Sequence, residues 1–220
     1  TGPRFGRGEG EAEQLVVFLH GLGADGSDLI ALAPVLARSL PDAAFVSPNA
    51  PFPCDMAPFG YQWFSFQSRE PADILAGVEA AAPRLETFLD AELARFGLAD
   101  SALALVGFSQ GAMMALHVAP RRASPCAAVL SYSGAVVAPE RLAAEVRARP
   151  PVLLVHGDAD EIVPFSNMAA AEAALKAAGL PVSAHRRPGL GHGIDETGLG
   201  LGLGLLQEVF GAERANRQEG

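Results

Sequence analysis

The segment of this 220-residue sequence with the clearest chemical potential is a serine flanked by glycines, Gly107-Phe-Ser-Gln-Gly111. The apolar residues 103–106 before it predict a buried strand, and the apolar run after it predicts a helix that begins at Gln110. A tight turn between the two needs glycine at both flanks, because a Cβ there would collide with neighbouring backbone. Such a turn lifts the hydroxyl of Ser109 above the sheet and points the free N–H groups of the helix start at the same place. The segment therefore predicts a nucleophilic serine beside a site for a developing oxyanion.

A serine hydroxyl is a weak nucleophile, so this chemistry needs a base within hydrogen-bond reach and a carboxylate that orients the base. In hydrolases built on such a turn, the chain order is serine, then an acid, then histidine. Asp160 and His192 follow Ser109 in that order, and each lies in a loop just after a predicted strand. The carboxyl ends of parallel strands form one edge of a sheet, where such sites are found. We therefore predict a catalytic triad of Ser109, Asp160 and His192.

Other residues compete for the two supporting roles. The rival bases are His20, His117, His156 and His185. Two of them end predicted strands and are expected to be structural residues beside the site, one lies on the helix after the serine, and one lies inside a predicted strand. Among the carboxylates, Asp158 shares a loop with Asp160 and is the alternative to it. Asp195 follows His192 too closely to reach round its ring.

Two backbone N–H groups are needed to hold the oxyanion of an acyl-transfer reaction. The N–H of Gln110, directly after the serine, is one candidate, and Leu22 in the glycine-rich loop 21–26 is the other. Residues 48–68 combine prolines, which forbid a regular element, with a high density of aromatic side chains. These aromatics are expected either to join the core or to line an apolar acyl pocket. The residues assigned to substrate contact are Met56, Trp63, Phe64 and Val163.

Short apolar runs alternate with helical periodicity along the chain. The runs predict strands at residues 14–20, 43–47, 103–106, 127–131, 151–156 and 182–187. Helices are expected at residues 29–40, with Ser27 or Asp28 as the cap, and at 74–96, 110–116, 139–147 and 166–178. This alternation predicts a doubly wound, mostly parallel sheet with helices on both faces.

The two ends of the chain give weaker signals. Residues 1–13 are polar and glycine-rich and are expected to be irregular or to form an edge strand. Residues 197–211 alternate glycine with leucine, which is the period of a strand, whereas the architecture requires a helix. We expect a helix there, although each interior glycine costs a helix about 1 kcal/mol relative to alanine. A single domain over residues 1–220 is expected.

Composition excludes several classes of function. The net charge of −9 and the pI near 5.0 give no footprint for nucleic acid, and the arginine pairs at 121–122 and 186–187 are expected to be solvated. Cys54 and Cys126 have neither metal-ligand nor disulfide spacing, so we expect no metal, two free thiols and a cytoplasmic location. No apolar run reaches the roughly 18 residues of a membrane-spanning helix. The expected partner is a small-molecule ester, with a second copy of the chain as the candidate for self-association.

Together these motifs resemble those of the phospholipase/carboxylesterase family of small α/β hydrolases, which includes acyl-protein thioesterases. The resemblance spans about residues 15–192 and is carried by His20-Gly-Leu-Gly23, Trp63-Phe64, Gly107-Phe-Ser-Gln-Gly111, His156-Gly-Asp-Ala-Asp160 with Val163-Pro164, and Gly191-His192. It implies an α/β-hydrolase fold without a cap domain, no cofactor, and hydrolysis of carboxylic esters, with thioesters and lysophospholipids as further candidates. Ser65 stands where the thioesterases commonly carry an acid, so the pattern is more similar to a bacterial esterase branch.

The resemblance also implies roles for single residues. Ser109, Asp160 and His192 match the family triad, and Leu22 and Gln110 match its oxyanion donors. One rival is an activity like that of dienelactone hydrolase, whose turn carries a cysteine, and Ser109 argues against it. A rival of another class is a non-catalytic protein of the same fold that binds an apolar ligand. Labelling by a fluorophosphonate distinguishes an active serine from such a binder.

Overall fold

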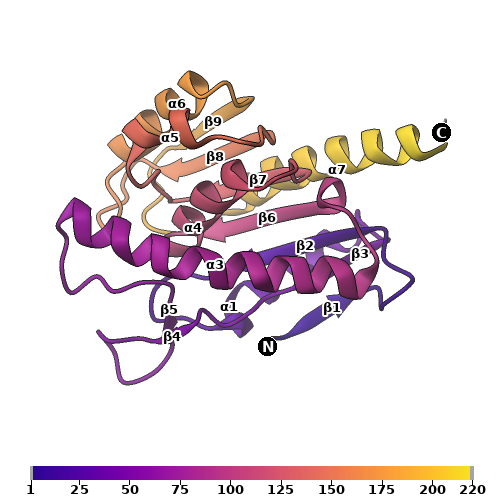
Figure 1. The fold of residues 1–220 in the computed structure, drawn as a ribbon, viewed down its shortest axis with the longest axis horizontal. Coiled ribbons are helices and arrows are strands. Elements are labelled where there is room, and N and C mark those ends of the chain that lie inside the picture. Colours follow the sequence, from indigo (N-terminus) through magenta and orange to yellow (C-terminus); the bar gives the residue numbers. More distant parts are fainter. Residues whose placement is uncertain (1, 219–220) are drawn as a thin grey trace.

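A seven-stranded sheet forms the centre of the computed structural model, which describes residues 2–218 (Figure 1). The strand order is β1-β3-β2-β6-β7-β8-β9. Strand β1 pairs antiparallel with β3, and the remaining pairs are parallel. The strands are β1 (Arg4–Gly6), β2 (Gln14–Leu19), β3 (Ala43–Val46), β6 (Leu103–Phe108), β7 (Ala128–Tyr132), β8 (Val152–Gly157) and β9 (Val182–Arg187). The expected parallel α/β sheet is therefore confirmed, and the N-terminal segment contributes an edge strand.

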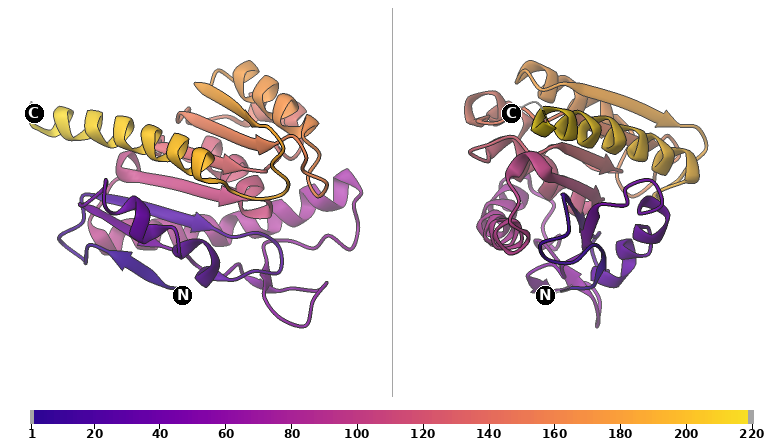
Figure 2. Two further views of the ribbon diagram at one scale, coloured as in Figure 1. Left: turned by 180° about the vertical axis from the view of Figure 1, so that it is seen from behind. Right: turned by 90° about the vertical axis from the view of Figure 1, so that its right-hand side faces the viewer.

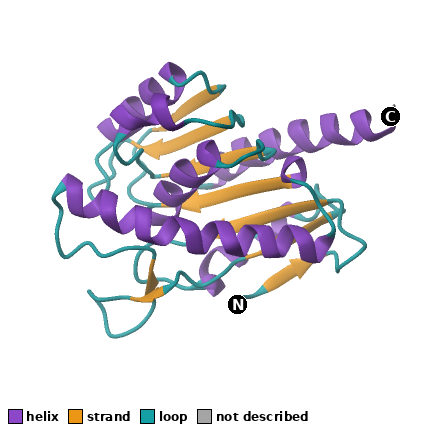
Figure 3. Cartoon of the chain, viewed as in Figure 1, coloured by secondary structure: helices purple, strands orange, loops and turns teal. Residues whose placement is uncertain are grey.

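Helices cover both faces of this sheet, as Figures 2 and 3 show. One face packs against α3 (Pro71–Phe96), α4 (Gln110–Val118), α5 (Pro139–Glu145) and α6 (Ser166–Ala177). The other face packs against α1 (Gly26–Ile30), α2 (Ala33–Leu36) and α7 (Glu196–Gln218). Two short 3₁₀ helices, Asp100–Ala102 and Ala119–Arg121, precede β6 and follow α4. Every residue of β2, β3, β7 and β8 is buried, which explains why these strands are mostly apolar and do not alternate with polar residues.

The helix expected over residues 29–40 is wrong in both extent and cap. The segment forms two short helices, α1 and α2, and the break falls before Pro34. Proline has no N–H to bond to the carbonyl four residues earlier, so a continuous helix cannot run through this position. The cap of α1 is Asp25, whose carboxylate accepts a hydrogen bond from the Ser27 N–H at 2.7 Å.

Residues 48–68 contain a small regular element that their prolines had argued against. Strands β4 (Phe52–Pro53) and β5 (Tyr61–Gln62) pair antiparallel in a separate two-stranded sheet. Proline fits there because the pair is short and has free edges, where no ladder bond is needed. The hairpin lies beside the carboxyl ends of the central strands, below them in the view of Figure 1.

The glycine-rich C-terminal segment is a helix, as expected. A Cβ on Gly202 would lie within 2.1 Å of the Tyr132 hydroxyl oxygen, and that hydroxyl donates a hydrogen bond to the Gly198 carbonyl at 3.1 Å. Glycine on this face of α7 thus lets the helix approach the sheet closely over a buried tyrosine. Within the described residues, no helix is long and apolar enough to cross a membrane.

Candidate active site

Ser109 sits in a strained turn between β6 and α4. Its φ of 54° and ψ of −117° lie in a region that costs a residue with a side chain of the order of 1–3 kcal/mol. A Cβ on Gly111 would lie 2.0 Å from the Leu19 carbonyl oxygen, and one on Gly107 would lie 2.5 Å from Ala112 Cα. Both glycines are therefore required by backbone contact, as the sequence predicted. The surrounding backbone holds the serine in a conformation that it would not adopt alone.

The loops after β8 and β9 bring Asp160 and His192 together. His192 Nδ1 lies 2.8 Å from Asp160 Oδ2, and Asp160 Oδ1 accepts the N–H groups of Ile162 and Val163 at 2.9 Å each. Burial of this carboxyl favours its neutral form, but the hydrogen bonds from His192 and from the two N–H groups outweigh burial and lower its pKa. Asp160 is therefore a carboxylate at neutral pH, and it is fixed in orientation before any ligand arrives.

The rival carboxylates are engaged elsewhere. Asp158 pairs with the Arg186 guanidinium and accepts the Gly189 N–H. Asp195 pairs with Arg187 and accepts the N–H of Gly198 in the first turn of α7. Neither carboxylate bonds to a histidine within the described residues. Of the three, only Asp160 can orient the imidazole of His192.

Ser109 and His192 both line one cavity of about 400 Å³ at this edge of the sheet. The His192 ring packs on Phe108 with 4.8 Å between ring centroids. Because Nδ1 bonds to Asp160, Nε2 is the ring nitrogen not bound to it. Within the described residues the Ser109 hydroxyl makes no hydrogen bond. A long or absent bond between nucleophile and base is common in unliganded sites and shortens when substrate binds.

The two candidate oxyanion donors meet beside Ser109. Leu22 lines the cavity, and an added Cβ on the preceding Gly21 would come within 3.4 Å of Ser109 Cβ. Gln110 is the first residue of α4, where N–H groups have no partner in the helix. In the described part of the chain neither the Leu22 nor the Gln110 N–H has a hydrogen-bond acceptor. Both groups are free to hold a developing negative charge.

The four residues predicted to contact substrate divide into two pairs. Met56 and Val163 line the cavity, whereas Trp63 and Phe64 do not. Both aromatic side chains are buried in the core, with about 2% of their surface exposed. Of the two options that the sequence left open for this loop, these aromatics take the core. They are linked to the site by the hydrogen bonds of the Trp63 indole N–H and of the main chain of both residues, and they do not line its surface.

Sequence reasoning missed several residues of the cavity wall. They are Arg69, Ile74, Phe108, Met113, Ala135, Ile162 and Asn167, whereas Phe66 is an aromatic of the loop 48–68 that lines the cavity as one of the two expected options. Helical spacing could have found Met113, because it lies one turn after Ser109 on α4. Ile162 is 69% exposed beside Asp160, and an exposed isoleucine next to a site carboxylate has no signature in sequence. A larger hollow of about 540 Å³ lies between α7 and β9, but its histidine, His185, bonds to no carboxylate within the described residues.

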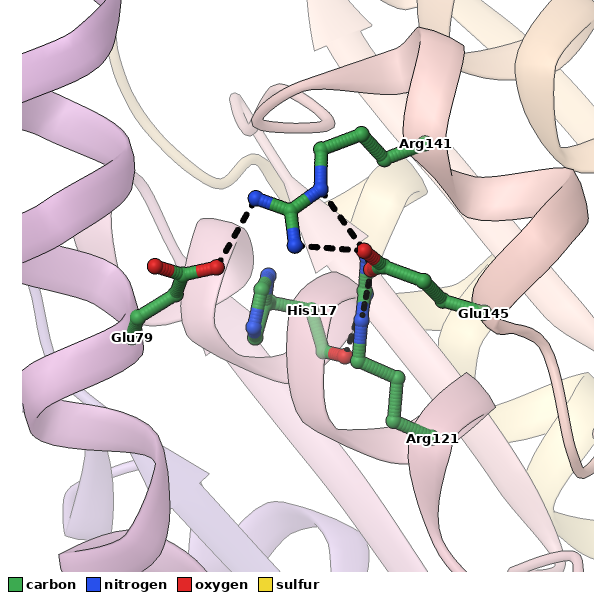
Figure 4. A network of polar contacts seen from close by, with 5 residues as sticks. All are labelled: Glu79, His117, Arg121, Arg141 and Glu145. Carbon is green, nitrogen blue, oxygen red and sulfur yellow. Dashed lines mark hydrogen bonds and ion pairs between the residues drawn. The ribbon is translucent and has the colours of Figure 1, made fainter.

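The histidine on α4, His117, belongs to a different environment. Its ring lies among four charged side chains, Glu79, Arg121, Arg141 and Glu145, that link α3, α4 and α5 (Figure 4). Arg141 bridges Glu79 and Glu145, and Arg121 bonds both Glu145 and the carbonyl of His117. The expectation that the arginine pair at 121–122 is solvated is therefore wrong. The next residue, Arg122, is 7% exposed and binds Asp90 and Asp100.

Burial and the nearby arginines lower the pKa of His117 to about 4 from an ordinary 6.5. Its Nδ1 is buried without a partner, so the ring is held neutral. The unfolded chain therefore binds one more proton than the folded chain between about pH 4 and 6.5, and stability falls as the pH drops through that window. Protonation of His117 across this window is expected to lower the free energy of unfolding by on the order of 3 kcal/mol. We expect His117→Gln to reduce the difference in unfolding free energy between pH 7.5 and pH 4.5, measured in urea. An unchanged difference would contradict this origin.

Comparisons with known proteins show which family the chain is similar to. Residues 3–202 match the family model described as phospholipase/carboxylesterase. The chain is 30% identical over 201 residues to esterase YpfH of Escherichia coli, an alignment that covers 89% of this chain and 83% of the relative. The crystal structure of esterase PE8 superposes with a TM-score of 0.91 at 44% identity, covering 95% of this chain and 98% of that one. Acyl-protein thioesterase 2 of Zea mays superposes with a TM-score of 0.77 at 26% identity, covering 96% and 100%.

The match to the family model spans nearly the whole chain and includes the strained serine turn, the loop that carries Asp160 and the histidine loop. The protein is a member of the phospholipase/carboxylesterase family and has its α/β-hydrolase fold.

Proposed function

We propose that the protein hydrolyses carboxylic esters in two steps through an acyl-enzyme on Ser109. The observation that carries the proposal is the bond between Asp160 Oδ2 and His192 Nδ1, on the wall of the cavity that also contains the strained Ser109. A carboxylate bound to Nδ1 keeps the proton there, so Nε2 stays free to accept one. A binding protein would need neither the strained serine nor the fixed histidine.

In the first step His192 Nε2 takes the proton of the Ser109 hydroxyl as Oγ attacks the ester carbonyl. The N–H groups of Leu22 and Gln110 hold the negative charge on the carbonyl oxygen. His192 then gives its proton to the departing alkoxide, and the C–O bond to the alcohol breaks. In the second step His192 takes a proton from water, the hydroxide attacks the acyl group, and the acid leaves as the proton returns to Ser109 Oγ.

The cavity predicts the size and polarity of the acyl group. Small-molecule sites span roughly 300–1,000 Å³, so this cavity of about 400 Å³ is near the small end. Its wall is mainly apolar, and the exceptions are Ser109, His192, Asn167 and the exposed Arg69. We therefore propose esters of short to medium unbranched acids as substrates.

A series of p-nitrophenyl esters from acetate to palmitate tests this proposal. We expect kcat/KM to be highest for acyl chains of about four to eight carbons and to fall steeply by palmitate, which overfills a cavity of this size. A fluorophosphonate probe should label the wild-type chain once, on Ser109, as peptide mass spectrometry would locate. A folded protein that neither labels nor hydrolyses any ester in the series would instead favour the non-catalytic binder.

We further propose a reducing compartment such as the cytoplasm as the location. Cys54 and Cys126 are both free, although Cys54 is partly exposed. Burial raises the pKa of the Cys126 thiol to about 12, so this side chain is inert. A disulfide through Cys54 in protein isolated from its native cells, visible on a non-reducing gel, would contradict this location.

A further inference from the structure

A continuous series of buried hydrogen bonds runs from the start of α4 to the loop after β2. The side chain of Gln110 bonds to the main chain of two successive residues: its Oε1 accepts the Trp63 N–H at 2.7 Å, and its Nε2 donates to the Phe64 carbonyl at 2.7 Å. The indole Nε1 of Trp63 then donates to the carbonyl of His20 at 2.9 Å. These three linking residues, Gln110, Trp63 and His20, are at most 2% exposed.

His20 extends the series by one more residue. Its Nε2 accepts the N–H of Ala50 at 2.9 Å, so that nitrogen carries no proton. The ring proton is therefore on Nδ1, which donates to the Gly21 carbonyl at 2.7 Å. Burial lowers the pKa of His20, which agrees with a neutral ring. The residue after Gly21 is Leu22, the first of the two candidate oxyanion donors.

The ends of this series are the two oxyanion donors themselves. Gln110 supplies one donor, which is its own backbone N–H. Its side chain also bonds to Trp63, and the Trp63 indole bonds to His20 at the start of the loop that carries Leu22, the other donor. Donors of an oxyanion hole act only when both lie about 2.7–3.1 Å from the charged oxygen. The glycine-rich loop that carries Leu22 has no regular structure between Gly21 and Ala24 to fix that distance.

We propose that the side chains of Trp63 and Gln110 are positioning residues that fix the distance between the Leu22 and Gln110 N–H groups. This inference rests on the proposed function and assigns these side chains a role in aligning the oxyanion hole. It also accounts for the location of Trp63, which is buried, does not line the cavity and bonds to His20 at the start of the loop. The neighbouring strand β5 adds two bonds to the same loop, Gly23 N–H to the Tyr61 carbonyl and Tyr61 N–H to the Ala24 carbonyl.

The test is Trp63→Phe, which keeps an aromatic ring in the core and removes the Nε1–H donor. Deleting one oxyanion donor costs about 10²- to 10³-fold in kcat, and displacing one should cost less, about 10- to 100-fold. We expect this loss in kcat for p-nitrophenyl butyrate with KM within about twofold, because the oxyanion exists only in the transition state. Affinity for an alkyl boronic acid, which forms a tetrahedral anion on the serine, should fall in parallel.

Gln110→Met provides a second arm, since it removes both side-chain bonds but leaves the Gln110 backbone N–H in place. The double variant should lose little more than the worse single variant, because both changes break the same series of bonds. The matched control is Phe45→Leu, which shortens a buried aromatic on β3 that stacks on Phe18 and lies outside this series. It should lower the Tm and leave kcat and boronate affinity unchanged.

The possible results are separable. A wild-type kcat and boronate affinity in Trp63→Phe, with an intact fold by circular dichroism, would overturn the positioning role while leaving the esterase proposal intact. A rise in KM of Trp63→Phe with no loss of kcat would also overturn the positioning role, because that result indicates a contact with the substrate in the ground state. If the wild-type chain itself neither hydrolyses esters nor binds the boronic acid, the proposed function fails first.

Discussion

Replacing Ser109 with alanine is expected to lower kcat by about 10⁴-fold or more while the fold stays intact. The change removes the nucleophile but leaves the Asp160–His192 bond and both oxyanion donors in place. Within the described residues the Ser109 hydroxyl has no hydrogen-bond partner, so its loss leaves no buried polar group unpaired. Hydrolysis of p-nitrophenyl butyrate measures the activity, and thermal unfolding followed by circular dichroism measures the fold.

A matched control for Ser109→Ala is available at Ser133, just after the neighbouring strand β7. Ser133 follows β7, has a positive φ of 50° and is buried, and its hydroxyl has no partner in the described part of the chain. It differs from Ser109 in lying outside the cavity. Ser133→Ala should therefore keep kcat within about twofold, whereas Ser109→Ala should also fail to label with a fluorophosphonate. Loss of labelling in Ser133→Ala with retention in Ser109→Ala would mean that the nucleophile is misassigned.

Strand patterning was readable from the sequence because the sheet is parallel and covered on both faces. Every residue of β2 and β8 is buried, and the largely apolar runs 15–19 and 152–155 are the direct consequence. The break between α1 and α2 was also available in principle, since Pro34 stands where a continuous helix needs an N–H. The helical periodicity of the leucines outweighed it. In α7 the opposite occurred, because tertiary packing against Tyr132 overrides the low helix propensity of glycine.

The site divides in a similar way. Ser109, Asp160 and His192 could be selected from chain order because the fold brings loops after parallel strands to one edge. Trp63 and Phe64 could not be placed, since an aromatic in a segment without periodicity shows that it is buried and not which surface it faces. The bonds from the Gln110 side chain to this segment join residues 47 and 46 positions apart. Nothing in local sequence encodes such a pairing.

Asp160→Asn is the second substitution with a large expected effect, and the surrounding hydrogen bonds fix how the new amide would sit. The N–H groups of Ile162 and Val163 both point at Oδ1, so the amide oxygen must take that position. The amide NH₂ is then forced into the place of Oδ2, facing His192 Nδ1 at 2.8 Å and His156 Nε2 at 3.2 Å. An NH₂ group can only donate, so Nδ1 must accept and the ring proton moves to Nε2. Nε2, the nitrogen that should accept the proton of the Ser109 hydroxyl, then already carries one.

With Nε2 protonated, His192 cannot take the proton of the Ser109 hydroxyl, and we expect kcat to fall by about 10⁴-fold at neutral pH. Asn keeps the shape of Asp and both bonds to Oδ1, so the unfolding free energy should change far less than the activity does. The matched control is Asp158→Asn, two residues away on the same loop, where the carboxylate binds the exposed Arg186 and bonds to no histidine within residues 2–218. It should keep kcat within about twofold, because breaking an exposed ion pair costs little. The sequence left Asp158 open as the alternative to Asp160. Full activity in Asp160→Asn combined with loss of activity in Asp158→Asn would show that Asp158, and not Asp160, orients His192.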